Sequence, residues 1–195
     1  MRICFVGESF VNGTGDPSCL GWAGRICAAA CQQGQDITYY NLGVRRETSM
    51  ALKQRWHQEV CYRLPPDVDG RVIFCFGVND TSPDLEGTRV PLDHSLQNAQ
   101  AILQTACQQF PVLMVSPLPI ADAAQNLRTA KLSQQLALLC NTLSIPYLDA
   151  FTPMQASEVW MREVAAGDGA HPGTEGYTEL AALVMQWSAW QNWFQ

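Results

Sequence analysis

The chain has 195 residues, of which 47% are hydrophobic and 15% are charged, a composition typical of globular rather than disordered proteins. Its formal net charge is −6, and its Lys and Arg residues are scattered, which argues against a nucleic-acid-binding surface. We therefore expect one domain, residues 1–195, whose partner is a small molecule and not a nucleic acid.

The eight cysteines lie mostly in apolar runs, where a free thiol behaves as a small hydrophobic side chain. Cys27 and Cys31 are one helical turn apart, but no second pair of Cys or His accompanies them, so we expect no metal and no cofactor. The first apolar run is too short for a secretory signal, and the apolar segment 180–194 is shorter than a membrane span. These features predict a cytoplasmic protein without a membrane-spanning segment.

Short apolar runs alternate along the chain with helical patterns. The predicted strands cover residues 2–7, 36–43, 71–77, 112–117 and 146–151. The predicted helices cover residues 21–33, 48–60, 92–110 and 132–143, and a last one begins near residue 174. This alternation predicts an α/β fold, a three-layer α/β/α sandwich around a five-stranded parallel sheet in the flavodoxin-like order 2-1-3-4-5.

Polar, turn-forming segments follow the first three predicted strands. The segment GESFVNG (7–13) follows the first strand, NLG (41–43) ends the second, and GVND (77–80) follows the third. A fourth segment, GDGAHPG (167–173), lies beyond the fifth strand. Each segment alone is a common turn sequence, so Ser9 is by itself either a nucleophile or a turn residue.

Taken in this order, the four segments resemble the sequence blocks of the SGNH, or GDSL-type, serine hydrolases, a family of esterases and lipases. The resemblance extends over nearly the whole chain. It implies a catalytic triad of Ser9, Asp168 and His171, and an oxyanion hole formed by Ser9, Gly43 and Asn79. The activity that it implies is hydrolysis of small acyl esters or thioesters through an acyl-enzyme.

The predicted strand order supports this arrangement independently. In the order 2-1-3 the first strand lies between the second and the third, which places Ser9 between Gly43 and Asn79 at the carboxyl edge of the sheet. The fifth strand lies roughly 14 Å from the first, so the chain must travel back to bring His171 to Ser9. Residues 151–170 provide this connection, which we expect to be a long functional loop.

Two positions depart from the family pattern. Glu8 stands where the family most often has aspartate, which affects the geometry of the first loop more than the chemistry. Arg46 stands where many relatives have a second glycine, and its side chain either favours acidic or polar substrates at the pocket rim or points into water.

The same returning segment carries apolar side chains that suggest a substrate pocket. Trp160, Met161 and Val164 either form an apolar acyl pocket or pack on the edge of the sheet. Apolar residues on a long loop usually have something to cover, but both interpretations remain open.

Two other functions fit the same pattern. A carbohydrate O-acetyl esterase would need polar groups for sugar hydroxyls, whereas the candidate pocket segment is apolar. A flavodoxin-like binding module would hold a nucleotide or phosphate at the same strand ends without chemistry. The first loop lacks both the Gly-x-Gly-x-x-Gly spacing and a basic residue for a phosphate, which argues against the binding module.

Overall fold

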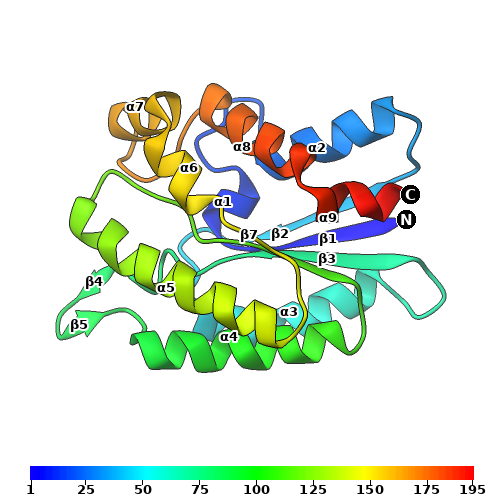
Figure 1. Ribbon diagram of the computed structural model, residues 1–195, viewed down its shortest axis with the longest axis horizontal. Helices are drawn as coiled ribbons and strands as arrows, with labels where there is room; N and C mark the ends of the chain where they lie inside the picture. The colour runs from blue at the N-terminus through cyan, green and yellow to red at the C-terminus, as the bar shows by residue number, and fades with distance from the viewer.

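The computed structural model describes residues 1–195 and has a parallel five-stranded sheet at its centre (Figure 1). The strand order is β2-β1-β3-β6-β7, the predicted order 2-1-3-4-5. The strands are β1 (Arg2–Gly7), β2 (Thr38–Gly43), β3 (Gly70–Cys75), β6 (Val112–Val115) and β7 (Tyr147–Leu148). Because β1 pairs with both β2 and β3, the ends of these three strands lie side by side.

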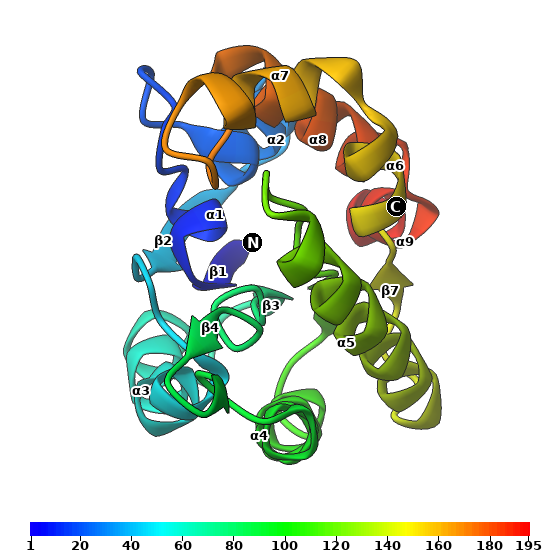
Figure 2. The same cartoon turned by 90° about the vertical axis from the view of Figure 1, so that its left-hand side faces the viewer.

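Helices cover both faces of the sheet, which completes the predicted three layers (Figures 1 and 2). One face carries α2 (Gly21–Gln32), α6 (Phe151–Ala156), α7 (Glu158–Ala166), α8 (Thr174–Gln186) and α9 (Ser188–Gln191). The other face carries α3 (Ser49–Arg63), α4 (Leu92–Cys107) and α5 (Ala123–Thr142). The short helix α1 (Ser9–Asn12) directly follows β1, and the 3₁₀ turn η1 (Asn192–Phe194) ends the chain. No helix combines the length and the apolar character needed to cross a membrane.

The central strands are apolar on both faces because each face packs against helices. In β1, Ile3 and Phe5 belong to one core cluster, whereas Cys4 and Val6 belong to the cluster on the opposite face. Successive side chains of a strand point to opposite faces, so a strand covered on both sides has to be apolar throughout. This explains why a continuous apolar run, and not an alternating one, predicted the strand.

The segment 151–170 differs from the expected long loop, because most of it forms α6 and α7. Ser157 begins α7 by accepting a hydrogen bond from the Trp160 N–H through its side chain at 3.0 Å. Trp160 and Val164 are four residues apart, so both face the core from one side of this helix. The prediction of a loop overlooked this spacing.

Two further elements lie outside the predicted pattern. Residues 79–93 contain the hairpin β4 (Pro83–Asp84) and β5 (Gly87–Thr88), for which no strand was predicted. Helix α5 begins well before residue 132, because the Asp122 side chain accepts a hydrogen bond from the Gln125 N–H at 2.9 Å and caps it.

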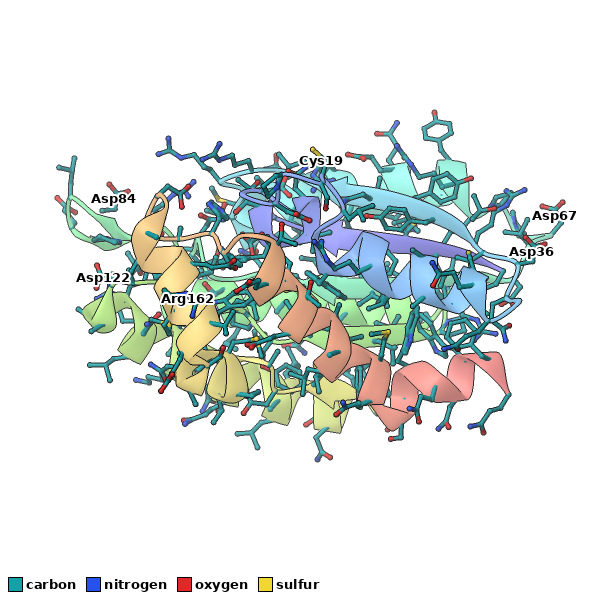
Figure 3. All side chains as sticks on the ribbon, turned by 90° about the horizontal axis from the view of Figure 1, so that it is seen from above. Cys19, Asp36, Asp67, Asp84, Asp122 and Arg162 are labelled. Carbon is teal, nitrogen blue, oxygen red and sulfur yellow. The ribbon has the colours of Figure 1, made fainter.

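The carboxyl ends of the strands form one end of the molecule, where α1, the hairpin and the start of α5 gather (Figure 2). In Figure 3, Asp84 and Asp122 mark this end, and Asp36 and Asp67 mark the opposite end. Residues that follow β1, β2 and β3 therefore meet at one edge, as the sequence predicts.

Candidate active site

Three side chains from the two ends of the chain form a continuous line at the carboxyl edge of the sheet. Nε2 of His171 lies 2.7 Å from Oγ of Ser9, and Nδ1 of His171 lies 2.8 Å from Oδ2 of Asp168. Ser9 is only 3% exposed, the His171 side chain is 9% exposed, and the Asp168 side chain is 44% exposed. Ser9 and His171 are therefore largely shielded from water, while the Asp168 carboxylate lies at the surface.

Ser9 is positioned by the sharp exit of the chain from β1. Gly7 ends the strand, and a Cβ atom there would lie 1.9 Å from the carbonyl oxygen of Cys75 on β3. Helix α1 begins at Ser9 and is terminated by its C-cap residue Gly13, which adopts the left-handed conformation with φ of 82°. Glycine at both positions lets the chain turn within a few residues and hold the Ser9 hydroxyl at the edge.

His171 is held by contacts on both sides of its loop. The Glu163 carboxylate on α7 accepts hydrogen bonds from the N–H groups of Gly173 and Gly176 at 2.9 and 2.7 Å. The ring of His171 lies 5.3 Å from the ring of Phe10, which in turn stacks on Trp160 at 5.9 Å. The returning helix α7 thus holds the imidazole in place through the hydrogen bonds of Glu163 to the loop backbone and through the packing of Trp160 on Phe10.

Asp168 is arranged to stay ionised. Its Oδ1 accepts hydrogen bonds from the N–H groups of Ala170 and His171 at 3.0 and 2.9 Å, and Oδ2 faces Nη2 of Arg45 at 3.3 Å. Although burial alone would raise it, these backbone hydrogen bonds and the contact with the His171 side chain lower the pKa of Asp168 to about 2. An ionised Asp168 favours the tautomer with the hydrogen on Nδ1, which leaves Nε2 free to accept the Ser9 proton.

Asn79 reaches the same place from the end of β3. Its Nδ2 donates a hydrogen bond to Oε2 of Glu8 at 3.1 Å, and the Ser9 hydroxyl lies at the same distance from that oxygen. The neighbouring Asp80 accepts a hydrogen bond from the Ser49 N–H at 2.7 Å, which ties the loop to the start of α3. The Asn79 amide therefore lies beside the Ser9 hydroxyl.

Gly43, the other predicted oxyanion donor, is placed differently. Its N–H donates to Oδ1 of Asn41 at 3.0 Å, and Gly43 is not among the residues that line the cavity beside Ser9. A Cβ atom at this position would lie 2.2 Å from the Asn12 N and 2.7 Å from the Glu8 carbonyl oxygen. Glycine is needed here because the backbone after β1 approaches β2 so closely.

A cavity of about 310 Å³ opens beside Ser9 and His171. Most of its lining is polar. The lining residues are Ser9, Phe10, Arg45, Arg46, Val78, Asn79, Ser82, Ile120, Gln125, Asp168, Ala170 and His171.

The predicted apolar pocket is absent from this lining. Trp160 and Val164 are completely buried in the core, where the Trp160 Nε1 donates to the Pro119 carbonyl oxygen at 3.0 Å. Met161 is partly buried and packs against the same cluster. These side chains therefore pack in the core on one face of the sheet, neither in the cavity nor on the sheet edge, whereas Arg46 lines the cavity.

The model of the GDSL-like lipase/acylhydrolase family matches residues 5–178. This chain belongs to that family. Members of the family hydrolyse esters, so the protein is an ester-hydrolysing enzyme. No curated protein matches the sequence.

Solved structures of similar proteins share the fold of this hydrolase. A lipase/acylhydrolase from Enterococcus faecalis is 20% identical, with a TM-score of 0.77 over 95% of this chain and 93% of that one. An acetylxylan esterase from Geobacillus stearothermophilus, solved as a catalytic mutant, is 17% identical, with a TM-score of 0.80 over 95% and 92%. A member of the lipolytic G-D-S-L family from Veillonella parvula is 17% identical, with a TM-score of 0.78 over 95% and 97%.

Glu8 has a larger place in the hydrolase site than its sequence position suggested. Its carboxyl group is buried, with Oε2 facing Ser9 and Asn79 and with no hydrogen-bond partner for Oε1. Burial raises the pKa of Glu8 to about 8, while the contact of its Oε2 with the Ser9 side chain opposes the rise. Glu8 is therefore protonated at neutral pH. A glutamine side chain is also uncharged and has nearly the same shape.

Replacing Glu8 with glutamine is expected to make stability less dependent on pH. Between the ordinary carboxyl pKa of 4.5 and about 8, the folded hydrolase keeps a proton on Glu8 that the unfolded chain has lost, so wild-type stability falls as pH rises. Chemical denaturation at pH 5 and pH 7.5 measures this loss. Between these two pH values, the free energy of unfolding of wild type should fall by about 3 kcal/mol more than that of the Glu8→Gln variant. Glu86→Gln on the exposed hairpin is the control, and equal pH profiles for wild type and Glu8→Gln would contradict the buried protonated carboxyl.

Other histidines and serines near strand ends stay outside the site. His57 contacts Oε1 of Gln109 at 3.0 Å on the outer side of α3, and His94 is exposed near the start of α4. Ser116 is buried, and its Oγ accepts hydrogen bonds from the N–H groups of Ala150 and Phe151. None of these side chains contacts Ser9, Asp168 or His171.

Sequence reasoning overlooked several residues that line the cavity. Arg45 adjoins Arg46, so its position in the second block was a signal that could have been used. Ser82 follows β3, and Gln125 lies in the first turn of α5, where nothing in the sequence marks it. These side chains come together only because the loops after β3 and β6 converge with the loop after β2.

Proposed function

We propose that this GDSL-like hydrolase is a serine esterase that cleaves short acyl esters through an acyl-enzyme on Ser9. The observation that carries the proposal is the 2.7 Å separation between the Ser9 hydroxyl and Nε2 of His171, whose other nitrogen faces Asp168. A hydroxyl, an imidazole and a carboxylate in this order are the arrangement that activates serine for attack on a carbonyl carbon. The cavity beside Ser9 gives an ester room to approach.

In the proposed reaction, His171 takes the proton of the Ser9 hydroxyl as the oxygen attacks the acyl carbon. The imidazolium then donates that proton to the departing alcohol, which leaves the acyl group on Ser9. Water enters, gives a proton to His171 and attacks the acyl carbon, and the proton finally returns to Ser9. Asp168 holds the imidazole and stabilises its charged form throughout.

The developing oxyanion needs hydrogen-bond donors about 3 Å away. We assign this role to the Ser9 N–H and to Nδ2 of Asn79, which has a second hydrogen besides the one that it donates to Glu8. Arg46 also lines the cavity, and its N–H forms no hydrogen bond within the protein, so it is a third candidate donor. Gly43 supports the site through the close approach of β2 to the Ser9 loop.

The polar lining favours a small acyl group, because a long alkyl chain would bury the charged and amide groups of the cavity without partners. The purified hydrolase is expected to cleave 4-nitrophenyl acetate with a kcat/KM at least about tenfold above that for the decanoate ester, since each poorly accommodated methylene costs affinity. Release of 4-nitrophenol across a series of chain lengths measures this preference. A maximum at eight or more carbons would contradict the short-acyl proposal.

A carbohydrate O-acetyl esterase is the second candidate. The amide of Gln125 and the hydroxyl of Ser82 line the cavity, and such groups suit sugar hydroxyls. A solved structure with this fold is an acetylxylan esterase, which adds support at the level of the fold. Acetate release from acetylated xylo-oligosaccharides at a higher kcat/KM than from 4-nitrophenyl acetate would favour this second candidate.

A further inference from the structure

Arginine side chains are concentrated at the mouth of the cavity in an otherwise acidic protein. Arg45 and Arg46 follow β2 and line the cavity, and Arg89 donates a hydrogen bond through Nη1 to the Arg46 carbonyl oxygen at 2.9 Å. The formal net charge of the whole chain is −6. Among the residues that line the cavity, Asp168 is the only acidic one, and Arg45 is already within 3.3 Å of it.

Arg46 differs from almost every other basic residue of the chain. The chain has twelve Lys and Arg residues, and ten of them place their charged group against a polar partner. The partner is a carboxylate, a side-chain amide or hydroxyl, or a backbone carbonyl. The charged groups of Arg46 and Lys131 contact no such partner. Lys131 lies away from the catalytic groups, on a separate hollow beside α4. Arg46 is therefore the one unpaired cation at the cavity.

The backbone of Arg46 is also unfavourable for an arginine. Its φ of 68° lies in the left-handed region, where any side chain other than glycine costs energy. An unfavourable conformation that places a side chain at a cavity indicates a role for that side chain. Here the side chain brings an unpaired, exposed positive charge to the cavity.

The position of the charge indicates which part of a substrate it meets. Ser9, Val78 and Ile120 are buried and form the inner part of the cavity, whereas Arg45 and Arg46 are exposed. A small acyl group fits the inner part, so the alcohol portion of the ester projects past the arginines toward solvent. Arg46 can then meet an anionic group on the alcohol portion, and guanidinium is well suited to bind a carboxylate in two places.

We propose that Arg46, assisted by Arg45, selects esters whose alcohol portion carries a carboxylate. This inference rests on the proposed esterase function and adds the class of its leaving group. The substrate carboxylate forms an ion pair with the Arg46 guanidinium, and this contact brings the ester carbonyl to Ser9.

The test compares 4-acetoxybenzoate, whose leaving group is anionic, with its neutral methyl ester. We expect the ratio of kcat/KM for the anionic ester to that for the neutral ester to fall about tenfold in Arg46→Gln, because the variant loses the charge and keeps the backbone N–H. The intrinsic reactivities of the two esters cancel when ratios are compared between proteins. Lys131→Gln, which removes the other unpaired cation, should keep the wild-type ratio.

Two additional conditions strengthen the test. Arg46→Gly relieves the left-handed backbone and also removes the charge, so it should fold well and show the same reduced ratio as Arg46→Gln. Raising the salt concentration to 0.5 M should lower the wild-type ratio, because exposed charges are screened.

The outcomes separate this inference from the esterase proposal. Equal ratios in wild type, Arg46→Gln and Arg46→Gly, with hydrolysis of the methyl ester that depends on Ser9, would overturn the carboxylate preference and leave the esterase function intact. Absence of turnover of both esters by the wild-type hydrolase would overturn the esterase function and this inference with it.

Discussion

Replacing Ser9 with alanine is expected to lower kcat/KM for 4-nitrophenyl acetate by at least about 10⁴-fold, because the variant has no hydroxyl to form the acyl-enzyme. The loss should appear in kcat, since the cavity that binds the ester keeps its other lining residues. Initial rates at several substrate concentrations separate kcat from KM. Alanine removes one buried oxygen from a helix of four residues, so the fold should be retained, and circular dichroism checks this.

Ser82→Ala is the matched control for Ser9→Ala. Ser82 lines the same cavity and also carries a hydroxyl, but it has no histidine beside it, and its Oγ accepts a hydrogen bond from Gln125 at 3.1 Å. We expect this variant to keep activity within about tenfold of wild type, because it loses only one neutral hydrogen bond. Comparable losses for the two serine variants would argue that neither hydroxyl is the nucleophile.

Substitution of His171 by alanine is expected to reduce kcat by about 10⁴-fold, since no other group in the cavity can accept the Ser9 proton in its place. Asp168 lies beyond His171 along the line of contacts, and Glu8 is protonated at neutral pH. Stopped assays with excess protein measure rates this low against the uncatalysed background.

The other two histidines provide internal controls for His171. His57 and His94 lie on outer helix surfaces, and alanine at either position should leave kcat within about twofold of wild type. A wild-type rate for His171→Ala, or a loss for His57→Ala as large as that for His171→Ala, would remove the imidazole of residue 171 from the mechanism.

Much of the fold follows from local patterns along the chain. The strand β1 could be recognised because Ile3 and Phe5 face one layer of helices while Cys4 and Val6 face the other, which makes the run apolar throughout. Strand order then followed from the general preference of such sheets. The helical nature of residues 151–166 was overlooked, although the spacing of Trp160 and Val164 indicated it.

The site could be predicted where its residues follow strands directly. Ser9 and Asn79 come after adjacent strands, so topology alone brings them to one edge. His171 required the family resemblance, because its position depends on a returning segment whose path is set by tertiary contacts such as those of Glu163.

Other features depend on contacts that no local pattern encodes. The buried carboxyl of Glu8 faces the side chain of Asn79, which lies 71 positions further along the sequence. The polar character of the cavity likewise comes from side chains of separate loops. The apolar segment around Trp160 therefore did not predict which residues line the cavity, because Trp160 is buried in the core.

The central claim, that the Ser9 hydroxyl is the nucleophile activated by His171, is tested most directly by covalent labelling with a fluorophosphonate followed by peptide mass spectrometry. This reagent reacts with activated serines, so one adduct per chain is expected, on the peptide that contains Ser9, with no adduct in His171→Ala over the same period. An adduct on Ser82, Ser116 or any other serine while Ser9 stays unmodified would contradict the account.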